Sequence, residues 1–399
     1  MVVASTNAIP FNRAYLTGAE AALIESVLNG GLLEGDGPFT ARASALLTEM
    51  IGAVATLLTT SCTHALELSA LVLDLRPGDE VIVPSFTFPS TANAYALRGA
   101  VPVFVDCRPD TLNLDERRIE AALTGRTRAI AAVHYAGVAC DMDAIGDLAR
   151  RHGLIVIEDN AHGLGGTYRG RPLGSLGALA TQSFHSTKNA HCGEGGALVI
   201  NRADLVERAE FIREKGTNRT QYYRGTVDRY RWVDIGSSYL PSELLAAFLP
   251  AQLERFAEIL GRRKEVWDAY HTRLAGWAAE CGVTQPTVPD GCVHPAHIYY
   301  LLLPDLPSRQ MFLRHLRERG IQATFHYQPL HDAPAGLRYG RTAPGGCPVT
   351  ERVADQLVRL PLYTGLGDDD LDQVVEAITS FRPAVRRDAL SGAQRGVRS

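Results

Sequence analysis

Short apolar runs alternate with amphipathic stretches between residues 60 and 200, which is the pattern of a sheet flanked by helices. The runs predict strands over 80–83, 101–105, 129–134, 154–158, 180–184 and 197–200. Several of them lack polar alternation, so we expect these strands to be buried on both faces. The amphipathic stretches predict helices over 63–75, 115–123, 142–151 and 204–215, and Asp141 is placed to cap the third. This part of the chain therefore predicts an α/β fold.

A smaller α+β unit should follow. After Pro241 the pattern is helical through residue 280, with an interruption expected at Pro250. Strands over 298–303 and 322–327 and helices over 308–319 and 368–381 come next. A chain of 399 residues exceeds the roughly 250 to 300 residues at which one core stops growing. We expect a large domain over 1–250, a smaller domain over 251–382 and a loose tail over 383–399 that is rich in Arg, Ala and Gly.

Composition excludes several classes of protein. Hydrophobic residues make up 46% and charged residues 21%, as in ordinary globular proteins, and the net charge of −4 implies neither a nucleic acid nor an anionic membrane as partner. Without a long apolar run or a signal peptide, the protein is expected in the cytoplasm. The seven cysteines form no Cys-x-x-Cys pair, which argues for reduced thiols and against a structural zinc site.

Lysine is scarce in this chain. Only Lys188, Lys215 and Lys264 stand among the 40 basic residues, which leaves 37 arginines. Since a guanidinium does not lose its proton, a lysine kept in this background is a candidate for chemistry that needs a free amine. Lys188 follows a predicted strand on a loop flanked by glycines, where a partly dry amine could form a Schiff base with an aldehyde. Codon bias is the alternative explanation for any single lysine.

Asp159 stands at the carboxyl end of the predicted strand over 154–158, where parallel sheets bind their ligands. A carboxylate there could keep a pyridine nitrogen protonated, as pyridoxal phosphate requires. Capping of the following turn is the competing explanation. Ser61, Cys62 and Thr63 open the predicted helix over 63–75, and a helix N-terminus rich in hydroxyls can bind a phosphate or simply be capped.

Other kinds of site are disfavoured. The glycine cluster over 163–166 lacks the G-x-G-x-x-G spacing and no helical run follows it, so a dinucleotide fold is rejected. The histidines show no H-E-x-x-H spacing, and no G-x-S-x-G elbow is present. We therefore expect no metal centre and no serine nucleophile.

Seven stretches resemble the DegT-type, pyridoxal-phosphate-dependent sugar aminotransferases. They are PSFTFPSTANAYALRGAVPVFVD (84–106), VHYAGVACDMD (133–143), VIEDNAHGLG (156–165), SFHSTKN (183–189), IREKGTNR (212–219), DIGSSYLPSELLAA (234–247) and FHYQPLH (325–331). The likeness is strongest to the members that aminate dTDP-4-keto-6-deoxyglucose at C4, the dTDP-4-amino-4,6-dideoxygalactose transaminases. It implies the fold called PLP type I, with a large domain around a mostly parallel sheet and a smaller C-terminal domain.

The resemblance also implies roles for individual residues. Lys188 is then the Schiff-base lysine, Asp159 the partner of the pyridine nitrogen and Phe88 the ring-stacking aromatic. Phosphate ligands implied by the resemblance are Ser61, Cys62, Thr63, Ser183 and, from the neighbouring subunit of a homodimer with composite active sites, Ser238. His162 stands where many relatives carry Gln, and it can make a similar hydrogen bond to the cofactor's phenolic oxygen.

The implied reaction moves an amino group from L-glutamate to the C4 ketone of the nucleotide sugar. Arg219 and Arg231 are candidates for its diphosphate, although a solvated basic face would explain them as well. His326, Tyr327 and His331 are expected to close over the sugar. Amination at C3 of a 3-keto sugar and a non-catalytic regulator that binds the cofactor remain alternatives. The C4 configuration of the product, galacto or gluco, stays open.

Overall fold

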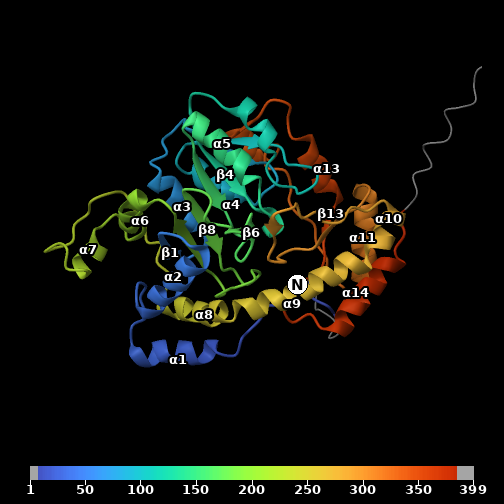
Figure 1. The fold of residues 1–399 in the computed structure, drawn as a ribbon, viewed down its shortest axis with the longest axis horizontal. Helices are drawn as coiled ribbons and strands as arrows, with labels where there is room; N and C mark the ends of the chain where they lie inside the picture. The colour runs from blue at the N-terminus through green and yellow to red at the C-terminus, as the bar shows by residue number, and fades with distance from the viewer. Residues whose placement is uncertain (1–7, 384–399) are drawn as a thin grey trace, which may run out of the picture.

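The computed structural model describes residues 8–383 and is built around an eight-stranded sheet. The strand order is β1-β9-β8-β5-β4-β2-β3-β12 (Figure 1). Neighbours from β8 to β12 pair in parallel, and β9 runs antiparallel to both β1 and β8. The predicted α/β fold with a mostly parallel sheet is therefore confirmed. The strands are β1 (Ala55–Thr59), β2 (Glu80–Pro84), β3 (Val101–Val105), β4 (Thr127–Val133), β5 (Ile155–Asp159), β8 (Leu179–Ser183), β9 (Gly196–Ile200) and β12 (Arg341–Thr342).

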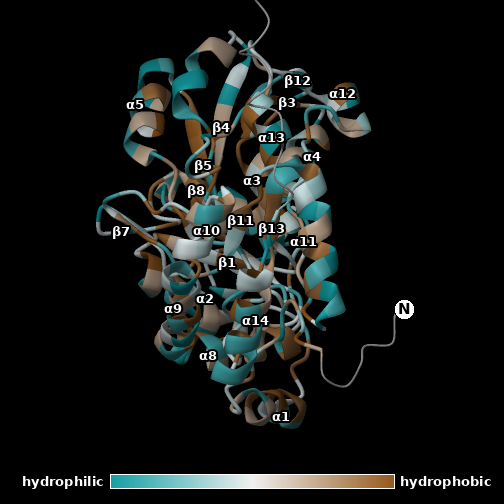
Figure 2. Cartoon of the chain, turned by 90° about the vertical axis from the view of Figure 1, so that its right-hand side faces the viewer, coloured by the Kyte–Doolittle hydropathy of each residue, from teal (hydrophilic) through white to brown (hydrophobic). Residues whose placement is uncertain are grey.

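Helices cover both faces of this sheet. Val81 and Val83 of β2 pack into one hydrophobic cluster with α3 (Cys62–Val72), α4 (Pro89–Ala96) and α6 (Val206–Arg213). Ile82, which points the other way, joins a second cluster with α5 (Met142–His152). Both faces of the central strands are thus buried, as their unbroken apolar runs predict. Figure 2 shows the brown strands between helices that turn teal residues outward.

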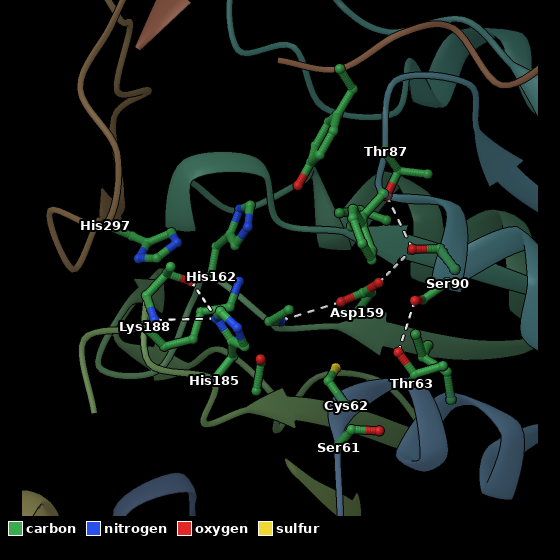
Figure 3. Close-up of a pocket in the computed structure, with 18 of the residues that line it drawn as sticks. Ser61, Cys62, Thr63, Thr87, Ser90, Asp159, His162, His185, Lys188 and His297 are labelled. Atoms are coloured by element: carbon green, nitrogen blue, oxygen red, sulfur yellow. Dashed lines mark hydrogen bonds between the residues drawn. The ribbon is translucent and has the colours of Figure 1, made fainter. Parts of the chain in front are cut away.

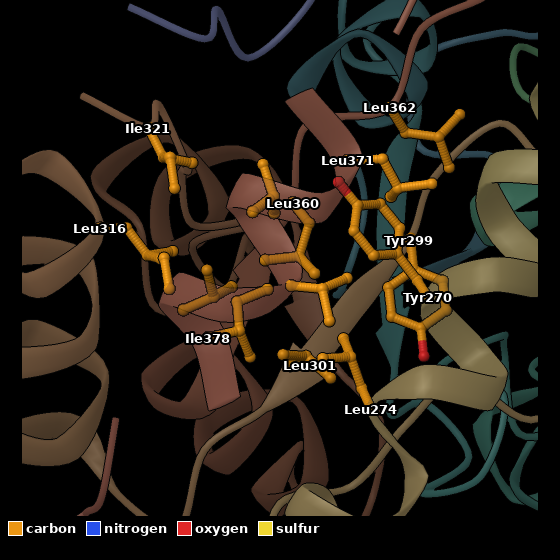
Figure 4. Close-up of a cluster of buried hydrophobic side chains, with 14 of the residues drawn as sticks. Tyr270, Leu274, Tyr299, Leu301, Leu316, Ile321, Leu360, Leu362, Leu371 and Ile378 are labelled. Atoms are coloured by element: carbon orange, nitrogen blue, oxygen red, sulfur yellow. The ribbon is translucent and has the colours of Figure 1, made fainter. Parts of the chain in front are cut away.

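The C-terminal elements form a separate core. The long helix α9 (Phe256–Arg273) crosses from α8 (Glu243–Glu254) to this unit, as Figure 1 shows. In the core of the C-terminal unit, Tyr270, Leu301, Leu316 and Ile378 pack together (Figure 4). The elements of this unit are α10 (Ala275–Cys281), β11 (Tyr300–Leu302), α11 (Leu306–Glu318), α13 (Pro348–Gln356), β13 (Leu357–Arg359) and α14 (Asp368–Ser380). We propose that this core belongs to the smaller domain expected over 251–382.

Two segments connect the units. Ile9 pairs with Ile321 and enters the C-terminal core, whereas β12 adds a strand to the large sheet beside β3. The remaining elements are α1 (Glu20–Gly30), α2 (Pro38–Ile51), α7 (Arg219–Tyr223), α12 (Pro334–Tyr339), β6 (Thr167–Tyr168), β7 (Arg171–Pro172), β10 (Cys292–Val293) and the 3₁₀ turns Glu116–Arg118, Glu120–Ala122, Tyr135–Gly137 and Ala203–Leu205.

Three predicted elements are wrong in detail. Residues 115–123 form two 3₁₀ turns instead of an α-helix, and the carboxylate of Asp115 accepts a backbone hydrogen bond from Arg117 at the first of them. Residues 322–327 make only the single bridge Thr324 to Arg359, so this stretch is not a strand. The helical stretch breaks at Arg255 rather than at Pro250, which lies buried inside α8.

Two expectations of the sequence analysis concern the predicted tail and membrane-spanning segments. Residues 384–399, most of the predicted tail, lie outside the described residues, as do residues 1–7. Among residues 8–383, none of the helices combines the length and the apolar character that a bilayer span needs.

Candidate active site

The carboxyl ends of the parallel strands border a cavity of about 400 Å³. Figure 3 places Lys188, His162 and His297 on one side of it, Ser61, Cys62 and Thr63 on the other, and Asp159 between them. This is where ligands of open α/β sheets bind. Ser183, Phe88, His326 and Tyr327 also line the cavity.

Lys188 lies on the loop that joins β8 to β9. Backbone hydrogen bonds from Phe184 to Gly195 and from Ser186 to Gly193, each 2.8 Å long, continue the antiparallel pairing into this loop and hold it at the cavity. Within residues 8–383 the amine of Lys188 makes no hydrogen bond or ion pair. Removal from water lowers the pKa of the Lys188 amine to about 8, because burial disfavours the charged form. The loop therefore presents an amine that loses its proton close to neutral pH.

Asp159 ends β5 with its carboxylate toward the cavity. Its Oδ2 accepts a 2.6 Å hydrogen bond from the Thr91 hydroxyl, and its Oδ1 accepts a 3.3 Å bond from the Ala161 amide. The preceding residue, Glu158, points away and accepts hydrogen bonds from the Gly174 amide and from buried His134. Alternation along the strand thus separates the two carboxylates, and only Asp159 can meet a ligand.

The turn before α3 opens toward Asp159. Ser61 caps the helix by accepting a 3.1 Å hydrogen bond from the His64 amide, and the hydroxyls of Thr63 and Ser90 are 2.8 Å apart. The first amides of a helix have no acceptor within it, so they are available to an anion. A Cβ at Gly196 would lie 2.3 Å from the Cys62 amide, so β9 needs glycine to pass this turn.

Cys62 carries a thiol rather than a thiolate. Burial, with a smaller contribution from the negative charge of Asp159, raises the pKa of the Cys62 thiol to about 12. Its sulfur lies 3.6 Å from the Thr181 hydroxyl. Cys62 therefore supplies a backbone amide and a neutral side chain to the cavity, and its thiol does not act as a nucleophile.

Three histidines line the side of the cavity near Lys188. The rings of His162 and His297 lie 4.5 Å apart, and His326 stacks on His162 at 6.3 Å. Burial lowers the pKa of each of these imidazoles well below the usual range of a histidine, so all three rings are neutral. The Nδ1 atom of His162 is buried and has no hydrogen-bond partner among the described residues. A ligand in the cavity can supply that partner.

Phe88 and Tyr327 bring two aromatic rings to the cavity. Phe88 is 57% exposed, and its ring centroid lies 6.3 Å from that of Tyr327. An aromatic face left open beside Asp159 can stack on a flat heterocycle.

Four predicted residues do not line the cavity of this chain. Arg219 pairs with Glu214 at 3.1 Å, and Arg231 and Ser238 are exposed on the segment that follows α7. His331 is buried beside the cavity, where it bonds the Ser85 hydroxyl at 2.7 Å and Glu351 at 3.1 Å. Any contact of these residues with a ligand needs another element or a second subunit.

Sequence reasoning missed other residues of the cavity. Thr91 and Ser90 lie within a stretch that carries the family resemblance, so their position could have been noticed. His297 and Arg359 come from the C-terminal unit and gave no local signal, since only the packing of the two units brings them beside Lys188. Among residues 8–383 there is no group of three metal-ligating side chains that could hold an ion.

A loop lysine and a strand-end aspartate in one cavity of a mostly parallel sheet define an aminotransferase-like site of PLP fold type I. The chain matches the model of the DegT/DnrJ/EryC1/StrS aminotransferase family over residues 15–379. It belongs to that family.

Individual relatives agree with this assignment. GDP-perosamine synthase from Caulobacter vibrioides is 36% identical over 321 residues, which cover 79% of this chain and 82% of that protein. Aminotransferase TlmJ from Streptoalloteichus hindustanus superposes with a TM-score of 0.83 at 32% identity, covering 92% and 96% of the two chains. The PLP form of Spr1654 from Streptococcus pneumoniae superposes with a TM-score of 0.84 at 27% identity, covering 93% and 98%. The predicted enzyme class is confirmed: the chain is a pyridoxal-phosphate-dependent sugar aminotransferase.

The cavity fits this cofactor. Lys188 offers a free amine, Asp159 a carboxylate, and the turn at α3 hydroxyls and amides for a phosphate. The buried, orphaned Nδ1 of His162 lies on the same side as Lys188, where a phenolic oxygen could bond it. The amine, the carboxylate, the turn and the imidazole therefore match, in that order, an aldehyde, a pyridine nitrogen, a phosphate and a hydroxyl of one flat ligand.

Proposed function

We propose that this protein transfers the amino group of L-glutamate to the C4 ketone of dTDP-4-keto-6-deoxyglucose, giving a dTDP-4-amino-4,6-dideoxyhexose. The observation that carries the transamination chemistry is the Lys188 amine in one cavity with the Asp159 carboxylate. The choice of a 4-keto-6-deoxy sugar rests on the resemblance described above. Its nucleotide remains a proposal, since the similar GDP-perosamine synthase is named for a GDP sugar.

Lys188 has two tasks in this proposal. It holds the cofactor through its Nζ atom in the resting enzyme, and after release it moves a proton between the cofactor carbon and C4 of the sugar. With a pKa of about 8, roughly a tenth of the Lys188 amine is neutral at pH 7, against less than a thousandth for an ordinary lysine. A proton carrier near the working pH is the most efficient kind.

The other cavity residues hold and orient the cofactor and the sugar. Pyridoxal phosphate, when bound, supplies an electron sink for the carbon that loses its proton. Asp159, oriented by Thr91, keeps the pyridine nitrogen protonated, and Phe88 covers the ring. Ser61, Cys62, Thr63 and Ser183 hold the phosphate, His162 bonds the phenolic oxygen, and His326 and Tyr327 contact the sugar.

The proposed enzyme is a homodimer with composite sites. The arm, residues 217–236, contains α7, projects from the rest of the chain in Figure 1 and exposes six large apolar side chains. They are Tyr222, Tyr223, Tyr230, Trp232, Val233 and Ile235. An exposed apolar group of this size suits a protein interface. Ser238, which follows the arm, would reach the partner's phosphate site, and Arg219 and Arg231 the diphosphate of a sugar bound there. We propose that His331, buried beside the cavity, shapes the sugar site through Ser85.

The function is tested by incubating the purified holoenzyme with L-glutamate and either a 4-keto or a 3-keto nucleotide sugar. NMR of the product should show an amine at C4. If only the 3-keto sugar is aminated, the enzyme acts at C3 rather than at C4. Visible absorbance that ignores every amino donor would indicate a non-catalytic regulator. The same NMR spectrum distinguishes the galacto from the gluco product.

A further inference from the structure

His297 lines the cavity on the same side as Lys188, and none of the proposed steps uses it. The residue is buried and comes from the C-terminal unit, just before β11. Its Nδ1 atom lies 2.9 Å from Oδ1 of Asn189, the residue that follows Lys188. Within residues 8–383 no hydrogen bond reaches its Nε2 atom. Nε2 is therefore the nitrogen that this ring offers to a ligand.

Asn189 fixes which nitrogen of His297 carries the proton. The Nδ2 atom of Asn189 donates a 2.7 Å hydrogen bond to the carbonyl of Pro295, and a carbonyl can only accept. The other end of the amide, Oδ1, must then face His297 as an acceptor. Burial keeps the imidazole of His297 neutral by lowering its pKa, so the ring has one proton, and Oδ1 requires it on Nδ1. Nε2 is left with a bare lone pair and can only accept.

The backbone that carries His297 is held in place by side chains. The carbonyls of residues 295–298 each accept a hydrogen bond from a side chain, and the donors are Asn189, Arg263, which serves two of them, and Trp267. Ala296 has a φ of +50°, in the left-handed region that a residue with a side chain rarely adopts. Strain of this kind persists only where the surroundings enforce it, and it concentrates at functional sites. These contacts fix the position of the imidazole as well as its proton.

The chemistry of the possible ligands decides what meets this lone pair. The proposed contacts of the cofactor already account for its phosphate, its pyridine nitrogen, its phenolic oxygen and its aldehyde. L-glutamate brings carboxylates, which carry no proton at neutral pH and cannot donate to Nε2. A keto sugar brings hydroxyls, which can donate. Of the two carbons beside C4 in a 4-keto-6-deoxyhexose, C3 carries a hydroxyl, whereas the oxygen on C5 is the ring ether.

We infer that Nε2 of His297 accepts a hydrogen bond from the C3 hydroxyl of the keto sugar, and that Asn189 is the positioning residue that keeps this nitrogen unprotonated. The inference rests on the proposed function, since it assigns a residue to the sugar half of the reaction. A sugar without this hydroxyl leaves a buried acceptor unpaired, so His297 selects sugars that are hydroxylated beside the ketone. The neighbouring His326 cannot take this role, because both of its ring nitrogens are already bonded to other side chains.

The 3-deoxy analogue of dTDP-4-keto-6-deoxyglucose tests this contact in the holoenzyme. Titration calorimetry gives the Kd of the analogue and of the parent sugar nucleotide, and the sugar half-reaction gives kcat/KM for both. In the wild type, kcat/KM should be about 5- to 100-fold lower for the analogue, as for a buried acceptor left unpaired. In His297→Phe this ratio should fall below about twofold, because the parent sugar has lost the same hydrogen bond. The half-reaction with L-glutamate, which brings no hydroxyl, should change less than about threefold in this variant.

Two pairs of variants complete the test. Asn189→Leu removes both hydrogen bonds of the amide and should lower the ratio between parent and analogue, whereas Asn189→Asp keeps an oxygen acceptor toward Nδ1 and should preserve it. His297→Gln offers an amide oxygen in place of Nε2 and should restore part of the ratio, and it replaces His297→Phe if that variant loses thermal stability. His152→Phe removes an exposed imidazole at the end of α5 and should match the wild type.

Equal values for the parent sugar nucleotide and its analogue in the wild type would overturn the inference, and the proposed function would stand if the product still carries its amine at C4. Equal losses in the sugar and L-glutamate half-reactions of a stable His297 variant would also overturn it, since they indicate packing against His162. An unchanged ratio in a stable Asn189→Leu would remove Asn189 from its positioning role. A wild type that distinguishes the two compounds in Kd through His297 but aminates neither would support the contact and refute the proposed function. A wild type that binds neither compound would overturn both.

Discussion

The hydroxyl of Thr91, on α4, donates a 2.6 Å hydrogen bond to the carboxylate of Asp159 at the end of β5. Thr91 is fully buried and also bonds the Thr87 hydroxyl at 3.0 Å. This contact ties the helix after β2 to the residue that faces the pyridine nitrogen in the proposed mechanism. It fixes the direction in which the Asp159 carboxylate presents its free lone pairs.

Replacing Thr91 by Val should release that carboxylate. A hydrogen bond to a charged acceptor contributes about 1.5–3 kcal/mol, so we expect kcat to fall roughly 10- to 100-fold. The visible spectrum of the bound cofactor should shift as well, because the ring loses its oriented partner. Thr91→Ser keeps the hydroxyl and should restore most of both signals. A Thr91→Val enzyme with the wild-type spectrum and kcat would remove this residue from a positioning role.

The depressed pKa of Lys188 predicts a pH dependence. Only the neutral amine attacks an aldehyde, so the rate at which pyridoxal phosphate joins the apoprotein should rise about tenfold per pH unit below 8. Above about pH 8 the rate should level, whereas an ordinary lysine would keep gaining to above pH 10. Stopped-flow absorbance measures this profile.

Borohydride reduction followed by peptide mass mapping checks that the reacting lysine is Lys188. Lys188→Arg should abolish the adduct and the activity, because a guanidinium cannot supply the neutral amine. Lys264→Arg alters an exposed lysine that pairs with Asp268 at 3.1 Å, and it should react like the wild type. An adduct on Lys215 or Lys264 would contradict the site assignment.

His162 should tolerate glutamine. Its ring is neutral and its Nδ1 atom is buried, so a neutral amide of similar reach can replace the hydrogen bond that we assign to it. We expect His162→Gln to keep kcat/KM within about fivefold, and His162→Phe, which has no polar atom, to lose about 10-fold or more. Steady-state kinetics with L-glutamate and the nucleotide sugar decide this. Equal losses in both variants would show that ring packing against His297, rather than a hydrogen bond, is what matters there.

The arm should hold the dimer together. Trp232 is 79% exposed in the single chain, and a tryptophan buried at an interface commonly contributes 2 kcal/mol or more to binding. Trp232→Ser should therefore raise the dimer dissociation constant at least about 30-fold in sedimentation velocity experiments. Leu337→Ser, at a 72% exposed position on α12, is the matched control and should leave it unchanged. A Trp232→Ser protein that stays fully dimeric would place the interface elsewhere.

Local patterns predicted much of the sheet and part of the site. The strand predicted over 101–105 agrees with β3 to the residue, because a fully buried strand needs an unbroken apolar run. Asp141 caps α5 as its position predicts, accepting a backbone hydrogen bond from Ala144. Lys188 was a candidate because lysine is scarce and this one lies on a glycine-flanked loop after a strand, and Asp159 because it stands at the carboxyl end of its strand.

Other features had no such signal. β1, which pairs with β9 at the edge of the sheet, was missed because its five residues show no distinctive pattern outside the pairing. The stretch over 322–327 looks like a strand, yet it finds only a single bridge, to Arg359. Pairing partners lie far away in the chain, and local periodicity cannot report them.

The amino-acid sequence alone determined the α/β class, the family and the two residues that we propose face the cofactor, because these depend on short segments whose periodicity and chemistry can be recognised without their tertiary contacts. Tertiary structure decided that Thr91 orients Asp159, that His162 and His297 are neutral, and that Arg359 joins Lys188 in one cavity. The physical reason is that burial and proximity set charge state and partnership. Both arise only when segments far apart in the chain pack together.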